Sequence, residues 1–110
     1  MMRAVLPTRR PNLTLDVVWQ GHPMAVTVGF DPATAAVLEV FANTPRGGSM
    51  QATIADACVV ISIALQSGVE LVALRKSLAR EPDLLRGEDA TRPASPVGAI
   101  IEAMIERVPS

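Results

Sequence analysis

The sequence predicts a single α+β domain in which a three-stranded antiparallel meander is followed by three helices packed on one face of the sheet. Two observations support this prediction. Hydrophobic residues alternate with a period of two between residues 13 and 42, and recur at spacings of three and four from residue 50 onward. The chain has 110 residues, of which 49% are hydrophobic and 19% charged, enough apolar material for one core. We therefore expect an N-terminal arm over 1–12 and one domain over 13–108.

The three strands come first. Apolar and more polar residues alternate over 13–19 and again over 24–30, which is typical of half-buried strands. Residues 20–23 (Gln-Gly-His-Pro) predict the turn between them, because glycine adopts positive φ easily and proline ends the ladder. A second turn over 31–34 leads to a third strand over 37–42. Short turns between strands favour a meander with one covered face.

The first helix is predicted from Met50, where an apolar stripe begins that runs to Leu65. Much of its remaining surface is apolar too, which predicts a core helix buried by more than one neighbour. Ser49 is the expected N-cap and Gly68 the residue that ends the helix. The longest apolar stretch, 54–65, is well short of the roughly 20 residues that span a bilayer.

Two further helices follow. The second is predicted over 69–80 and stops at Glu81–Pro82, because proline disfavours helical geometry in the residue before it. Residues 83–94 are charged and are expected to be irregular. Ser95 and Pro96 open the last helix as N-cap and first helical residue.

The composition argues against several classes of function. Ten basic residues against eleven acidic ones, and 3% aromatic residues, argue against a nucleic-acid-binding surface. One Cys and one His exclude an intramolecular disulfide and argue against a Cys/His zinc site within one chain, so no metal site is predicted. The N-terminal residues lack the apolar region of a signal peptide, so we expect a cytoplasmic protein without a membrane partner.

The middle of the chain resembles the TSCPD domain. The string ISIALQSGV at Ile61–Val69 is similar to the family's ISLALRSGV pattern, and Glu39–Thr44 and Ala52–Ala57 extend the match. This domain is the C-terminal module of adenosylcobalamin-dependent ribonucleotide reductases and also occurs as short stand-alone proteins. The resemblance implies a non-catalytic interaction module accessory to ribonucleotide reduction. Adenosylcobalamin enters only by family association, and no cofactor is expected on this chain alone.

One departure from the family pattern lies ahead of the last helix. Ser95 stands where the family has the Cys of its Thr-Ser-Cys-Pro-Asp string, and Val97 stands where it has Asp. A thiol or metal role of that Cys therefore does not carry over. The large reductase barrel cannot fit in 110 residues, so a reductase subunit is the least favoured interpretation.

The loop before the first helix is the candidate ligand site. Arg46, Gly47, Gly48 and Ser49 would bind a nucleotide or cofactor phosphate, because backbone N–H groups at a helix start attract anions. The alternative is an ordinary strand-to-helix connection.

Two residues beside that loop are candidates for supporting it, namely Asn43 and Asp56. A hydrogen bond from Asp56 to the loop would fix its shape, whereas the alternative is simply a carboxylate placed near the positive end of the helix. No catalytic residues are predicted, since Cys58 lies in an apolar run and His22 in a turn without a partner.

Three helices of this size cannot cover every apolar residue of the strands, which predicts a homodimer. The interface would be the sheet or the apolar back of the first helix. A reductase chain or another protein is a further candidate partner, and a nucleotide is the candidate ligand.

Overall fold

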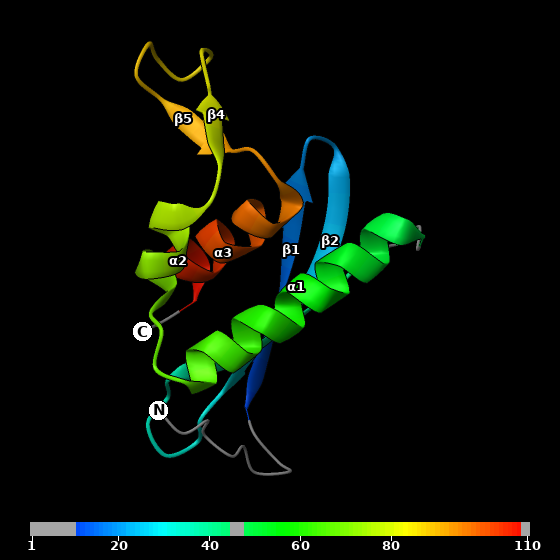
Figure 1. Ribbon diagram of the computed structural model, residues 1–110, viewed down its shortest axis with the longest axis vertical. Coiled ribbons are helices and arrows are strands. Elements are labelled where there is room, and N and C mark those ends of the chain that lie inside the picture. The colour runs from blue at the N-terminus through cyan, green and yellow to red at the C-terminus, as the bar shows by residue number, and fades with distance from the viewer. Residues whose placement is uncertain (1–10, 45–47, 109–110) are drawn as a thin grey trace.

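The structure, a computed structural model, describes residues 11–44 and 48–108. Three antiparallel strands form the main sheet in the order β1-β2-β3, and the helices cover one of its faces, as predicted (Figure 1). The elements in chain order are β1 (Asn12–Trp19), β2 (His22–Phe30), β3 (Val37–Asn43), α1 (Ser49–Gln66), α2 (Leu71–Ser77), β4 (Arg80–Pro82), β5 (Thr91–Pro93) and α3 (Pro96–Arg107).

The β1–β2 hairpin is tighter than the sequence predicts. Its turn consists of Gln20 and Gly21, whose φ angles of 47° and 77° are both positive, as a type I′ turn requires. His22 and Pro23, expected in the turn, belong to β2. Pro23 lies opposite Val18, beyond the part of β2 that pairs with β3, so its missing N–H costs no hydrogen bond of the sheet.

The core lies between the inner face of the sheet and the two long helices. The most deeply buried side chains come from all these elements: Val26, Val28, Val40, Ile54, Cys58, Ile100, Ile101 and Met104. No described helix or strand covers the outer face of the sheet, where Val18 and Phe41 are 65% and 50% exposed. Helices therefore cover one face only, the α+β arrangement expected from strands followed by helices.

The prediction that α1 is buried by more than one neighbour holds for its inner side only. That side packs along β3 and also contacts α3, but Val59 and Val60 on the outer side are 54% and 66% exposed, and Met50 and Ile63 are exposed too. The hydrophobic pattern of residues 50–65 cannot distinguish a helix that is buried all round from one whose outer side is exposed. Within the described residues α1 is long and apolar enough to cross a bilayer by length and composition, yet its inner side packs on the sheet as a core helix does.

The ends of α1 correct one prediction and confirm another. Gly48, with φ of 90°, is the N-cap, and Ser49 is the first helical residue without a side-chain cap bond. Gly68 ends the helix with φ of 94°, as predicted. The N–H groups of Val69 and Gly68 donate to the carbonyls of Ala64 and Leu65 at 3.0 and 3.1 Å, the pairing of a Schellman motif.

The second predicted helix is too long. It ends at Ser77, because the backbone of Leu78 is extended (ψ 150°). Part of the segment expected to be irregular pairs as β5 with β4, forming a hairpin that projects away from the main sheet (Figure 1). The last helix is as predicted: Ser95 Oγ accepts a hydrogen bond from the Gly98 N–H at 3.1 Å, and Pro96 is the first helical residue.

Candidate functional site

Three polar side chains of α1 cover the outer edge of β3. Ser62 Oγ accepts from the Val40 N–H at 3.0 Å and donates to the Val40 carbonyl at 3.2 Å. Gln66 Nε2 donates to the Leu38 carbonyl at 3.0 Å. Gln51 Nε2 donates to the Ala42 carbonyl at 3.3 Å. Side chains of α1 thus replace the next strand of the sheet along this edge.

This arrangement explains the most specific part of the family resemblance. Within ISIALQSGV, Ile61 is buried in the core, Ser62 and Gln66 cover the β3 edge, and Gly68 ends the helix. Each of these roles is structural. The string therefore specifies how α1 is fixed to the sheet, without itself forming a ligand site.

The loop ahead of α1 is the predicted ligand site. Arg46 and Gly47 lie outside the described residues. Gly48 and Ser49 are exposed, and α1 has neither an acidic residue in its first turn nor a side-chain cap. Asn43 is the exposed last residue of β3. The phosphate site therefore stays a prediction.

The loop has a support that the sequence did not reveal. Gln51 Oε1 accepts hydrogen bonds from the Thr44 N–H at 2.7 Å and the Thr44 hydroxyl at 2.8 Å. Asp56, the candidate for this role, is exposed on α1. The sequence does contain a signal for this role of Gln51, namely a glutamine in the first turn of an apolar helix that follows the end of a strand.

The reactive side chains of the described region are engaged structurally. Burial raises the pKa of the Cys58 thiol to about 11, so it stays protonated at neutral pH and is a poor nucleophile. His22 stacks on Trp19 with ring centroids 6.2 Å apart. Across residues 11–44 and 48–108, no three His, Cys, Asp or Glu side chains gather as a metal ion would require.

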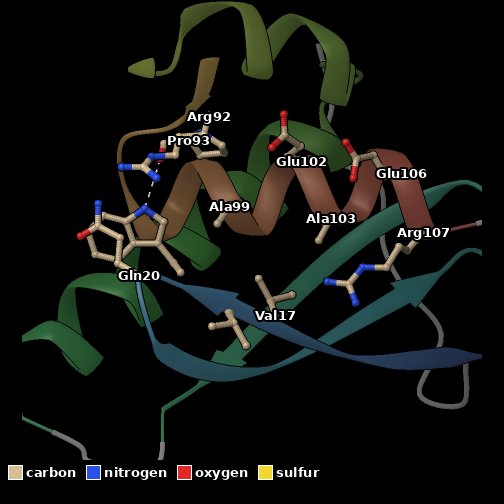
Figure 2. Close-up of a pocket in the computed structure, with 11 residues that line it drawn as sticks. Val17, Gln20, Arg92, Pro93, Ala99, Glu102, Ala103, Glu106 and Arg107 are labelled. Carbon is tan, nitrogen blue, oxygen red and sulfur yellow. Dashed lines mark hydrogen bonds between the residues drawn. The ribbon is translucent and has the colours of Figure 1, made fainter. Parts of the chain in front are cut away.

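A groove lies between β1 and α3, with a volume of about 300 Å³ (Figure 2). We call it the β1–α3 groove. Ala99 and Ala103 face Val17 across it, whereas Glu102 and Glu106 leave the helix on the other side (Figure 2). The small alanine side chains keep the space beside β1 open.

A hydrogen bond lies at each end of the β1–α3 groove. At one end, Trp19 Nε1 donates to the Pro93 carbonyl at 3.2 Å. At the other end, Arg107 Nη1 donates to the backbone carbonyl of Asp16 at 2.8 Å. These bonds join α3 and the residues before it to β1. In this chain Ser95, in place of the family Cys, serves as the cap of α3 within that connection.

A polar network ties the β4–β5 hairpin to its neighbours. Glu81 accepts from Gln20 Nε2 and from Arg92 Nε, both at 3.1 Å. Arg80 forms a 3.1 Å ion pair with Glu102 of α3. These pairs are partly exposed and contribute little stability individually, so they orient the hairpin more than they stabilise it.

Comparison with known proteins gives one match. The family model described as TSCPD domain matches residues 3–108, nearly the whole chain. No curated protein and no solved structure matches.

Proposed function

Because the chain belongs to the TSCPD domain family, we propose that it is a non-catalytic binding module that docks onto a protein of ribonucleotide reduction. The partner we favour is the reductase chain of a cobalamin-dependent enzyme, which would carry the adenosylcobalamin. The observation that carries the proposal is the outer face of α1. We define this α1 outer face by Asp56, Val59, Val60 and Ile63.

The α1 outer face has the properties of a docking surface. The helix is about 27 Å long and carries one charged residue, Asp56. Val59 and Val60 are more than half exposed although β-branched apolar side chains are usually buried. An apolar face with a single carboxylate fits an apolar helix or groove that offers one basic group.

The chemistry of the described residues supports a non-catalytic role. The thiol of Cys58 is buried with a raised pKa, and His22 stacks on an aromatic ring instead of facing a carboxylate. A dithiol reaction of the reductase type needs a pair of cysteines, and the chain has one. The proposal places the protein in the cytoplasm, beside the reductase.

Binding to the purified reductase chain of the same organism tests this function. Biolayer interferometry should detect the complex, and Val60→Asp should weaken it by about tenfold or more, because a carboxylate would be buried against apolar groups. Leu84→Asp is the matched control, since Leu84 is 76% exposed on the distant β4–β5 hairpin. No binding by the wild type, or equal loss in both variants, contradicts the proposal.

A phosphate-binding function is the second candidate. The observation that favours it is the start of α1, where Gly48 has a positive φ and no side chain caps the helix. A nucleotide or cobalamin present at 100 times its dissociation constant should add about 2.7 kcal/mol to the free energy of unfolding. Arg46→Ala should remove that gain in a thermal-shift titration while leaving the unliganded melting temperature unchanged. A gain equal in both proteins excludes the site.

A further inference from the structure

Among the described residues, most of the outward backbone groups at the outer edge of β1 lack a hydrogen-bond partner. The bond from the Phe30 N–H to the Pro11 carbonyl, together with the two-residue turn, places the odd-numbered residues of β1 in hydrogen-bonded pairs with β2. The N–H and C=O groups of Thr14, Asp16 and Val18 therefore point away from the sheet. We call this row the β1 edge. Among the described residues its one hydrogen-bond partner is Arg107, on the Asp16 carbonyl.

Alternate residues of the eight-residue strand β1 present these outward groups, and such an edge is a template for another strand. The chain covers the equivalent groups of β3 with side chains from α1. The β1–α3 groove lies beside the β1 edge, because Val17 and Val18 line it from the strand and Ala99 and Ala103 from the helix. The groove leaves room for additional chain next to β1, which a close-packed helix would not.

We propose that a second copy of this chain occupies the β1 edge, with the two β1 strands antiparallel across a twofold axis. The same edge then serves both copies, as in the commonest closed assembly. This inference does not depend on the proposed docking of α1, because it uses the opposite edge of the sheet.

The charges along the groove favour a second copy. Arg92, which stays 47% exposed beside its bond to Glu81, lies at one end of the β1–α3 groove, and the exposed Glu106 lies at the other (Figure 2). A twofold axis through the groove makes the two copies antiparallel. Arg92 of each copy would then lie near Glu106 of the other. In the dimer, Arg107 at the Glu106 end would release the Asp16 carbonyl to the second copy and stay beside Glu106 of its own chain.

The side chains of β1 select the register. With the axis at Asp16, the two carboxylates would lie directly opposite each other, which is destabilising. With the axis at Val17, Asp16 of each copy pairs with Val18 of the other and both sets of backbone groups form hydrogen bonds. The result is one continuous sheet with α1 at each end, so the dimer would present two α1 outer faces.

Val18→Pro tests this interface directly. Proline removes the outward N–H of Val18, which makes no hydrogen bond within the described chain, and edge strands tolerate it. Light scattering with size exclusion should give twice 11.6 kDa for the wild type and 11.6 kDa for the variant at the same micromolar concentration. Val18→Thr, which keeps the N–H and the β-branched shape, should remain dimeric.

Two outcomes overturn the proposal: the wild type stays at 11.6 kDa on tenfold concentration, or Val18→Pro stays dimeric. In the second case, dissociation of the dimer by Val60→Asp would assign self-association to α1. Circular dichroism and the fluorescence of Trp19 establish that each variant is folded. Loss of reductase binding with a persisting dimer would contradict only the function proposed for α1.

Discussion

At the outer edge of β3, Gln51, Ser62 and Gln66 of α1 take up the backbone groups that an adjacent strand would bind. At the outer edge of β1, the described residues supply Arg107 alone. The backbone chemistry of the two edges is the same, so the difference lies in the side chains that the helices present. The buried and part-buried hydrogen bonds at the β3 edge occupy backbone groups that another strand would need, whereas the β1 edge can exchange one exposed arginine for a strand.

The largest expected effect is on the helix that covers the β3 edge. Ile61 is 7% exposed on the inner side of α1, and Ile61→Ala should lower the free energy of unfolding by about 2–5 kcal/mol through lost burial and a cavity. Val60→Ala is the matched control on the outer side of the same helix, with an expected change within about 0.5 kcal/mol. Urea denaturation measures both. Equal losses would mean that the two sides of α1 are packed alike.

A smaller effect isolates the hydrogen bonds of the covered edge. Ser62→Ala leaves the buried N–H and carbonyl of Val40 without their partner, which should cost about 1–3 kcal/mol. Ser77→Ala is the control, because the Ser77 hydroxyl is exposed and its one partner in the described part of the chain is the Ala73 carbonyl of its own helix. Calorimetric melting compares the two. If Ser62→Ala loses no more stability than Ser77→Ala, water can replace the Ser62 hydroxyl as the hydrogen-bond partner of Val40.

The strand pattern and the two long helices could be predicted from the sequence, because hydrophobic periodicity is a local signal. The β4–β5 hairpin could not, since it depends on Arg80 bonding to Thr91 and on Trp19 bonding to Pro93, 74 residues apart. The polar residues that cover β3 were missed for a related reason. From sequence alone, a polar residue in an apolar helix, such as Ser62, is expected to face solvent, because the strand that it contacts is not known.

The pH dependence of stability offers a third test of how tightly α1 covers the sheet. Burial raises the pKa of Cys58 to about 11 from 9.0, so folding favours the protonated thiol. The resulting stability is fully present below pH 9 and is lost as the pH rises through about 11. Cys58→Ala should lack this alkaline slope in denaturation curves. A wild-type slope equal to that of the variant would mean that the thiol is solvated.

The smallest expected effect concerns the open edge. Arg107 donates to the Asp16 carbonyl at 2.8 Å, the group that Val18 of a second copy would need. Arg107→Ala should therefore leave the free energy of unfolding within about 1 kcal/mol, because the pair is exposed, and should tighten the dimer several-fold. Arg86→Ala, an exposed arginine on the β4–β5 hairpin, is the control and should change neither quantity. Sedimentation equilibrium at several concentrations gives the dissociation constants. A dimer weakened by Arg107→Ala would mean that Arg107 supports the interface. The β1 edge would then be covered by its own side chain, as the β3 edge is, and would not be open to another strand.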